Sequence, residues 1–241
     1  MNLYKRISQE GKRRIAVLID PDKNTTGSLD RIIHNCNQFA IDYIFVGGSL
    51  IVVGNISETI ALIKQKTRIP VLIFPGNVIQ ISDKADGILF LSLISGRNPE
   101  YLIGQHVTAA PALKKSGIEI IPTAYILIEN GRTTSVEYIS NTIPIPADKP
   151  EIVVATALAG EMLGMKMIYL EAGSGAAKSV ALGIISEVRK NVRIPVIVGG
   201  GIRNGDDAKK IFNAGADVVV VGSVVEENPD VIAELCSSRK L

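Results

Sequence analysis

Three glycine-rich segments in the last third of the chain could bind an anion. They are Tyr169-Leu170-Glu171-Ala172-Gly173-Ser174-Gly175, then Gly199-Gly200-Gly201-Ile202-Arg203, then Gly222-Ser223. Each follows a short apolar run, and a strand that ends in a glycine turn before a helix exposes backbone N–H groups to an anion. Such turns can also serve only to pack a helix closely on a strand. Because two of them are neighbours near the end of a chain of 241 residues, we favour a phosphate site.

Two side chains of the first segment could act on a hydroxyl group. Tyr169 and Glu171 alternate along a predicted strand, so both can point to the same face. A carboxylate accepts a hydrogen bond from a hydroxyl or takes its proton. The late part of the chain therefore predicts a site for a monophosphate that carries hydroxyl groups. A structural ion pair is the alternative role for Glu171.

Oxygen ligands follow the first two predicted strands. Asp20 and Asp22 follow residues 14–19, and Gly48 and Ser49 follow residues 42–46. Hard oxygens without His or Cys suit Mg²⁺, which usually binds through one or two carboxylates and substrate phosphates. These side chains could instead be simple helix caps. The early part of the chain thus indicates a site for a phosphorylated partner that carries Mg²⁺.

The composition excludes several classes of function. The net charge is +2 and only 5% of the residues are aromatic, with no Trp, so we expect no nucleic-acid surface. No stretch of about 18 apolar residues exists, which argues against a membrane-spanning protein. Cys36 and Cys236 match no metal spacing, and a reducing cytoplasm fits them. His34 and His106 lie in helical patterns and are expected to be core or surface residues.

Apolar runs and turn signals predict eight strands that mostly alternate with helices. We expect strands at residues 14–19, 42–46, 69–74, 86–91, 118–128, 167–170, 194–198 and 217–221. We expect helices at residues 3–11, 26–37, 50–67, 99–116, 151–163, 176–191, 206–214 and 229–237, the first of them short and polar.

The pattern predicts an α/β fold, a (β/α)8 TIM barrel modified at its third unit, with residues 1–241 as a single domain. Residues 78–84 are too short for a full barrel helix, and residues 129–150 form a long irregular excursion, a lid or a wall. Residues 71–74 and 88–93 supply an apolar wall between the two polar sites. An open doubly wound sheet is the alternative, but the first strand lacks its G-x-G-x-x-G turn.

Several segments together resemble the geranylgeranylglyceryl phosphate synthase family, which includes the heptaprenylglyceryl phosphate synthases. The shared segments, in family order over nearly the whole chain, are residues 18–23 (LIDPDK), 46–49 (VGGS), 74–77 (FPGN), 169–175 (YLEAGSG) and 198–203 (VGGGIR). The segment at 169–175 is the most specific. Some bacterial members carry a lysine where this chain has Leu18, so the chain resembles the archaeal-like branch, which uses a C20 prenyl chain.

The resemblance implies a prenyltransferase that joins sn-glycerol 1-phosphate to geranylgeranyl diphosphate or a similar polyprenyl diphosphate. It implies Mg²⁺ at Asp20 and Ser49. We expect Glu171 and Tyr169 to be the catalytic pair, with Glu171 orienting the attacking hydroxyl or accepting its proton and Tyr169 supporting the geometry. The partners implied are the two substrates and further copies of the chain, with at most transient membrane contact. The glycerol phosphate residues implied are Tyr169, Leu170, Glu171, Ala172, Gly173, Ser174, Gly175, Gly200, Gly201, Gly222 and Ser223.

Two other functions fit a phosphate-binding barrel. A phosphosugar isomerase, synthase or aldolase would need a lysine or a second acid at a strand end that faces the phosphate. Lys166 precedes a strand and Lys23 lies in a loop, so neither is well placed for a Schiff base. A barrel that binds a phosphate ligand or a flavin without catalysis is the other alternative.

Overall fold

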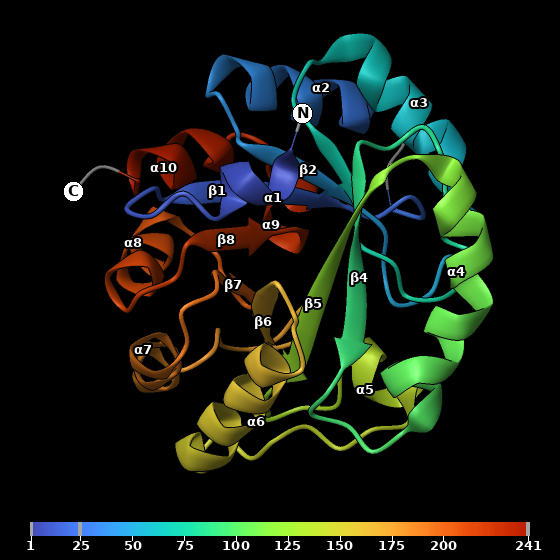
Figure 1. Cartoon of the computed structure of the whole chain (residues 1–241). Coiled ribbons are helices and arrows are strands. Elements are labelled where there is room, and N and C mark those ends of the chain that lie inside the picture. Colours follow the sequence, from blue (N-terminus) through green and yellow to red (C-terminus); the bar gives the residue numbers. More distant parts are fainter. Residues whose placement is uncertain (1, 24–25, 240–241) are drawn as a thin grey trace.

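The computed structural model describes residues 2–23 and 26–239, and parallel strands form a closed barrel at its centre (Figure 1). Each strand pairs with the next in sequence, and β8 pairs with β1 to close the ring. The predicted (β/α)8 barrel is therefore confirmed. The strands are β1 (Arg14–Ile19), β2 (Tyr43–Val46), β3 (Val71–Ile73), β4 (Gly87–Leu93), β5 (Glu119–Leu127), β6 (Met167–Glu171), β7 (Val196–Gly199) and β8 (Val218–Val221).

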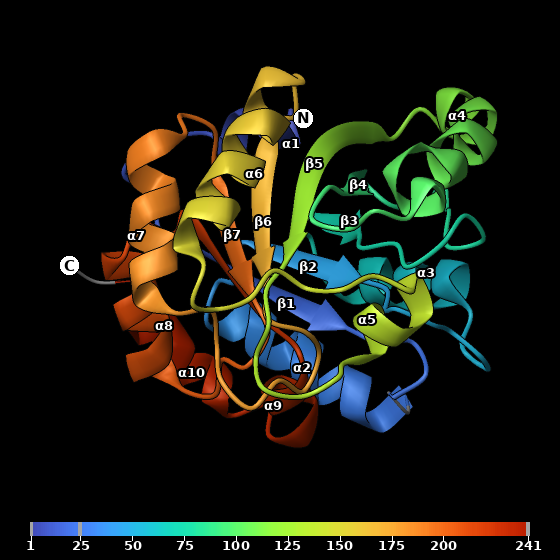
Figure 2. The same cartoon turned by 90° about the horizontal axis from the view of Figure 1, so that it is seen from below.

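Helices surround most of the barrel (Figure 2). A π-helical turn at Glu100–Gly104 leads directly into α4, and α5 lies within the excursion predicted for residues 129–150. The helices are α1 (Leu3–Ile7), α2 (Thr26–Gln38), α3 (Ile56–Lys66), α4 (Gln105–Ser116), α5 (Ser135–Ser140), α6 (Pro150–Met162), α7 (Leu182–Asn191), α8 (Gly205–Asn213), α9 (Ser223–Glu227) and α10 (Val231–Ser237).

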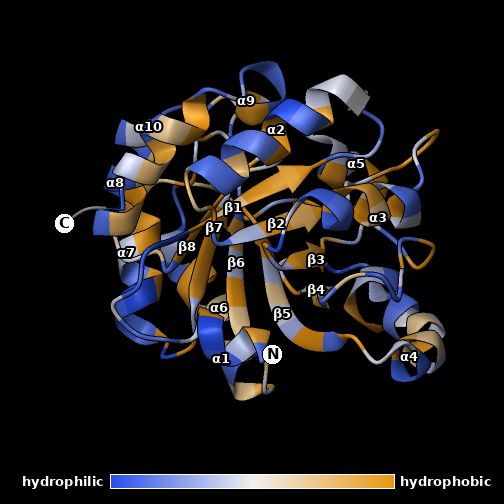
Figure 3. Ribbon diagram, turned by 90° about the horizontal axis from the view of Figure 1, so that it is seen from above, coloured by the Kyte–Doolittle hydropathy of each residue, from blue (hydrophilic) through white to orange (hydrophobic). Residues whose placement is uncertain are grey.

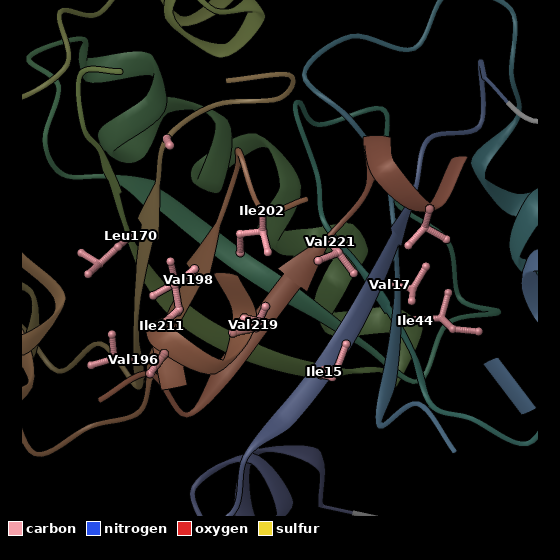
Figure 4. Close-up of a cluster of buried hydrophobic side chains, with 14 of the residues drawn as sticks. Ile15, Val17, Ile44, Leu170, Val196, Val198, Ile202, Ile211, Val219 and Val221 are labelled. Carbon is pink, nitrogen blue, oxygen red and sulfur yellow. The ribbon is translucent and has the colours of Figure 1, made fainter. Parts of the chain in front are cut away.

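Alternation along the strands divides the core into an inner and an outer layer. Tyr169 of β6 packs inside the barrel, whereas its neighbour Leu170 packs outward, under the helices. The strands are mostly apolar, and α8 alternates polar and apolar residues as an amphipathic helix does, whereas α6 is apolar over most of its length (Figure 3). The labelled side chains of Figure 4 belong to the outer layer and include Leu170 and Val219. This alternation fixes which strand residues can reach the inside of the barrel.

The first helix closes the barrel at the amino ends of the strands. Leu3 and Ile7 are buried in the inner layer, so the predicted polar helix is in fact amphipathic. The side chain of Glu119 in β5 accepts hydrogen bonds from the first amides of α1, from Leu3 N at 2.5 Å and from Tyr4 N at 2.8 Å. The cavities described below lie toward the opposite end, where the strands end.

The third barrel unit departs from the repeat, as the sequence predicts. No helix joins β3 to β4 in this described part of the chain, and residues 74–86 form turns instead. The helix after β4, α4, lies on this side of the barrel (Figure 1, Figure 2). The irregular unit leaves room for the groove described below.

Two predicted helices begin later than expected. The helix predicted at 50–67 begins at Ile56, because Asn55 caps it by accepting hydrogen bonds from Ser57 N and Glu58 N. The helix predicted at 176–191 begins at Leu182, so residues 172–181 form a longer loop after β6. A short helix after Gly222, α9, was not predicted.

No helix in the described part of the chain is both long and apolar enough to cross a bilayer. Cys36 and Cys236 are both free thiols.

Candidate active site

A polar basin of about 570 Å³ opens where the strands end, and its volume is in the range of small-molecule sites. It collects residues from the ends of β1, β2, β6, β7 and β8 and from the excursion after β5. The predicted site residues that line it are Asp20, Ser49, Tyr169, Glu171, Ser174, Gly175, Gly200, Gly201, Gly222 and Ser223. The structure thus brings together residues that are up to about 200 positions apart in sequence.

Glu171, at the end of β6, is a buried carboxyl group on the wall of this basin. Burial raises the pKa of Glu171 to about 7, against an ordinary value of 4.5, although three hydrogen-bond donors counteract the rise. One donor is Gly173 N, at 2.6 Å from Glu171 Oε1, and the others are the hydroxyls of Tyr169 and Tyr125. A carboxyl group with a pKa near neutrality can both take and return a proton.

Tyr169 and Tyr125 stand side by side, because β5 and β6 pair them in register. Burial raises the pKa of both phenols well above 10, so both hydroxyls stay protonated and act as donors. Tyr169 Oη is buried and completes no hydrogen bond of good geometry within residues 2–23 and 26–239. A polar atom of this kind on a basin wall is suited to a ligand hydroxyl.

Close packing explains why positions 173 and 200 are glycines. A Cβ at Gly200 would lie 2.5 Å from Glu171 Oε1, and the residue has φ +85°, which side chains rarely tolerate. At Gly173, with φ +98°, a Cβ would overlap the side chain of Thr134 in the excursion after β5. These turns therefore bring bare backbone next to the carboxylate and dock the excursion over the site.

Three residues of the predicted glycerol phosphate segment do not line the basin, namely Leu170, Ala172 and Gly173. The side chains of Leu170 and Ala172 pack in the outer core instead, because alternate strand residues face away from the barrel. Gly173 acts through its amide, which binds Glu171. Any contact of Leu170 and Ala172 with glycerol phosphate must therefore come from their backbone atoms, and the assignment of these two residues stays a prediction.

Asp20 lies at the edge of the basin in a small charged network. Lys23 Nζ is 3.5 Å from Asp20 Oδ2 and 3.5 Å from Glu226 Oε2. Asp20 N donates to Glu226 Oε1 at 3.1 Å. Burial raises the pKa of Glu226, and the Lys23 ammonium opposes that rise. The Lys23 side chain thus lies between the carboxylates of Asp20 and Glu226 at the rim of the basin.

Asp22 has a structural role rather than a place in the basin. Its carboxylate accepts hydrogen bonds from Val52 N at 2.7 Å, Val53 N at 3.0 Å and Gly54 N at 2.6 Å. These backbone donors lower the pKa of Asp22. The second acid of the LIDPDK segment therefore orders the loop between β2 and α3.

Asp20 and Ser49 fit a hard cation by their donor chemistry. Both line the basin. Gly48 precedes Ser49 in the loop after β2, and a Cβ on Gly48 would lie 3.4 Å from Asp20 Oδ2, so this loop lies close to the Asp20 carboxylate. No cluster of three or more His, Cys, Asp or Glu side chains occurs among the described residues. A site with few protein oxygens is typical of Mg²⁺, which takes its other ligands from water and phosphates.

An apolar groove opens beside the basin, on the irregular side of the barrel. Its walls come from β4, α4 and α5, and four residues of the predicted wall at 88–93 contribute to it, namely Ile88, Phe90, Leu91 and Leu93. Of the predicted wall at 71–74, only Phe74 lines the groove, because Val71, Leu72 and Ile73 are fully buried in the barrel. The apolar lining is Phe74, Val78, Ile81, Ile88, Phe90, Leu91, Leu93, Ala109, Leu113, Val136 and Ile139.

The groove and the basin share a border. Five residues line both cavities, and they are Gly48, Ser49, Phe74, Tyr125 and Val136. A ligand with a polar head and an apolar tail can therefore place its head beside Asp20 and Ser49 and its tail in the groove.

Sequence reasoning missed several residues of the site. Arg132, Ser135 and Val136 come from the excursion after β5, whose fold over the basin has no local signal. Tyr125 lies inside a strand, and its only signal is an aromatic ring in an otherwise aliphatic run. Glu226 precedes the last helix and resembles a surface residue in sequence. Arg132, Lys23 and Arg203 add positive charge around the basin.

Comparisons with known proteins agree with this geometry. Residues 8–238 match the PcrB family. The chain is 53% identical over 220 residues to the geranylgeranylglyceryl phosphate synthase of Flavobacterium johnsoniae (91% of this chain, 90% of that one). It is 47% identical over 237 residues to that of Spirosoma linguale (98% and 95%). The structure of (S)-3-O-geranylgeranylglyceryl phosphate synthase from Thermoplasma acidophilum, in complex with substrate sn-glycerol-1-phosphate, superposes with a TM-score of 0.93 at 33% identity (100% and 99%).

Proposed function

The chain belongs to the PcrB family, and from this premise we propose that it is a geranylgeranylglyceryl phosphate synthase. It joins sn-glycerol 1-phosphate to geranylgeranyl diphosphate or a similar polyprenyl diphosphate, giving a prenylglyceryl phosphate ether and diphosphate. One observation carries the proposal: a buried carboxyl group with a pKa near 7 lies in a glycine-lined basin that opens into an apolar groove. This arrangement suits one small polar substrate and one long apolar one.

The basin is the acceptor site in this proposal. The loops that contain Gly200, Gly201 and Gly222 offer backbone amides to the phosphate, and Ser174 and Ser223 offer hydroxyls. Arg132 and Arg203 add positive charge around the basin. A phosphate fixed there leaves the 3-hydroxyl of the glycerol free to reach Glu171. The Tyr169 hydroxyl, which faces Glu171 without completing a hydrogen bond of good geometry, can donate to one of the glycerol oxygens.

At C1 of the prenyl group, the transfer forms one bond to oxygen and breaks another. The 3-hydroxyl oxygen of glycerol 1-phosphate bonds to C1 of the prenyl group, and the C1–O bond to diphosphate breaks with its electron pair on the departing diphosphate. The hydroxyl proton passes to Glu171, whose pKa near 7 suits it to take that proton at neutral pH. Gly173 N and Tyr125 hold the carboxylate in place.

We propose that Asp20 and Ser49 hold Mg²⁺ together with the diphosphate of the donor. When bound, the ion neutralises the leaving group's charge. The oxygen donors at the border of the basin support this assignment. Lys23 lies beside Asp20 and can add a second positive charge near the diphosphate. The predicted homo-oligomer, the cytoplasmic location and transient membrane contact stay predictions.

The alternative of a phosphosugar aldolase finds less support. Lys23 is the lysine that lines the basin in the described part of the chain, and its side chain pairs with Asp20 and Glu226 at the rim instead of facing the glycine turns that would hold a phosphate.

The proposal is tested by incubation of the purified protein with radiolabelled sn-glycerol 1-phosphate, Mg²⁺ and prenyl diphosphates of 10 to 35 carbons. We expect an acid-stable labelled product that partitions into organic solvent, with the greatest yield from the C20 donor. No labelled ether with any donor would overturn the proposal.

A further inference from the structure

Three aromatic rings meet at the border between the groove and the basin. Phe74 and Tyr169 have ring centroids 5.3 Å apart, Tyr125 and Tyr169 5.3 Å, and Phe74 and Tyr125 6.0 Å. The chain has only eleven aromatic residues, six Tyr and five Phe. A concentration of three of them at one point of a mostly aliphatic barrel calls for a cause beyond packing.

The rings come from different elements that converge on this point. Phe74 follows β3, Tyr125 lies in β5, and Tyr169 lies in β6 opposite Tyr125. Phe74 and Tyr125 line both cavities, whereas Tyr169 lines the basin. All three are at least nine-tenths buried, so water does not surround their faces. Phe74 and Tyr125 therefore border the space where the two substrates must meet.

This inference rests on the proposed function and concerns the charge that develops during the transfer. As the C1–O bond of the donor breaks, its electron pair leaves with the diphosphate and the allylic carbons become positive. The border is lined mainly by rings and small or aliphatic groups, so little water is available to solvate this charge. The face of an aromatic ring carries partial negative charge and attracts a cation within about 6 Å.

We propose that Phe74 and Tyr125 are catalytic residues that stabilise the allylic cation through their ring faces. Glu171 cannot serve this purpose alone, because its negative charge decreases when it takes the hydroxyl proton. The face of a ring takes up no proton and stabilises the cation without forming a bond to it. The two rings thus complement the carboxylate: Glu171 acts on the oxygen and the rings act on the carbon.

Fluorination of Phe74 separates this role from packing. Each fluorine withdraws electron density from the ring face while changing its shape little. We expect replacement of Phe74 with mono-, di- and trifluorophenylalanine to lower kcat in steps, by about tenfold in all, with an unchanged Kd for glycerol 1-phosphate. The same series at Phe212 of α8, which lines neither the groove nor the basin, should leave kcat unchanged.

A binding experiment gives a readout independent of turnover. An ammonium analogue of the prenyl chain, with nitrogen at the allylic carbon, is titrated into the protein with inorganic diphosphate, beside a neutral isostere. We expect the parent protein to prefer the cation, and Phe74→Leu and Tyr125→Leu to reduce this preference by about tenfold each. Tyr125→Phe, which keeps the ring, should retain it.

Either of two results would overturn the proposal. The first is a kcat that does not change with the number of fluorines at Phe74. The second is a Phe74→Leu variant that prefers the ammonium analogue over its neutral isostere as strongly as the parent protein does. Binding of glycerol 1-phosphate reports that each variant is folded. If the parent protein makes no prenyl ether, the proposed function fails; if it makes the ether but fluorination has no effect, only the role of the rings fails.

Discussion

The polar basin and the apolar groove are built from opposite halves of the barrel and by opposite means. The basin lies over β6, β7 and β8, where the βα repeat is regular and glycine turns expose the backbone. The groove lies beside β3 and β4, where a helix is absent and α4 and α5 supply the walls. One barrel can therefore bind two substrates of opposite polarity because one half keeps the repeat and the other half breaks it.

The basin relies on backbone groups, whereas the groove relies on apolar side chains. In the proposed function, the basin binds the phosphate mostly through backbone amides, so the sequence must supply glycines that fit. In the groove, affinity comes from apolar area, and many aliphatic side chains would serve. Changes in the basin should therefore damage acceptor binding or chemistry, and changes in the groove should affect the donor alone. The predictions below test this division, from the largest expected effect to the smallest.

Removal of the basin's base should have the largest effect. We expect Glu171→Gln to lower kcat by about 10²- to 10⁴-fold, because the amide accepts no proton, while the Kd for glycerol 1-phosphate changes little. Steady-state kinetics and calorimetry measure the two quantities. The control is Glu187→Gln on α7, which removes an exposed ion pair with Lys190. Equal loss of kcat in both variants, or none in Glu171→Gln, would contradict the assignment.

Ionisation of Glu171 as the pH rises should activate the enzyme and lower the free energy of unfolding. The pKa of Glu171 is about 7 in the folded protein and 4.5 ordinarily, so the folded state binds more protons between these pH values. The contribution of Glu171 to stability is thus greatest below about pH 4.5 and is lost as pH rises through 7, by about 3 kcal/mol.

Denaturant unfolding at several pH values measures this effect. We expect Glu171→Gln to gain stability relative to the parent as pH rises from 5 to 8, while the parent's kcat/KM rises over the same range. A parallel pH dependence of stability in parent and variant would show that Glu171 titrates at its ordinary pKa.

A smaller loss is expected when a methyl group enters the glycine turn. In Gly200→Ala, the new Cβ would lie 2.5 Å from Glu171 Oε1 and the backbone has φ +85°. We expect the KM for glycerol 1-phosphate to rise by about 10- to 100-fold, with the KM for the donor unchanged. Gly183→Ala on α7, where a Cβ meets nothing within 4 Å, is the control. A rise in the donor KM instead would break the division between the two regions.

The reverse result is expected in the groove. Ala109 of α4 is buried and lines the groove, so Ala109→Leu should fill part of the space for the tail and raise the donor KM by about tenfold. The KM for glycerol 1-phosphate should stay the same. Ala110→Leu adds the same atoms to the exposed face of the same helix and should change neither constant.

The smallest effect on catalysis is expected at Asp22, which belongs to neither cavity. Asp22→Asn keeps the size of the side chain but weakens its hold on the amides of residues 52–54. We expect faster hydrogen exchange at these amides and a kcat within about twofold of the parent. Asp20→Asn, in contrast, should lower kcat strongly. A similar kcat for the two variants would contradict the different roles given to the two acids.

The same division explains what could be predicted from the sequence. The barrel, its eight strands and the missing helix follow from local patterns of apolar residues and turns. The basin residues Glu171, Gly200 and Ser223 follow too, because the ends of parallel strands meet on one face. In these cases a local signal and a simple rule of topology are enough.

The residues of β4 that line the groove were expected to be apolar, but the rest of the groove and the border could not be predicted in the same way. Arg132 and Val136 reach the site because an irregular excursion folds back over it, and a long loop carries no local signal of its path. Leu170 was predicted to bind substrate as part of its segment, and strand alternation places its side chain in the outer core, which leaves only its backbone for such a contact. Asp22 looked like Asp20 in sequence, and only the loop at 52–54 separates their roles.

The central claim is that the basin supplies the attacking oxygen and the groove supplies the carbon that accepts it. Glycerol 1-phosphate labelled with ¹⁸O at its 3-hydroxyl tests this claim most directly, with mass spectrometry of both products. We predict that all of the label is in the ether oxygen and none in the released diphosphate. An unlabelled ether, or label in the diphosphate, would show that the glycerol C–O bond breaks and would contradict the account.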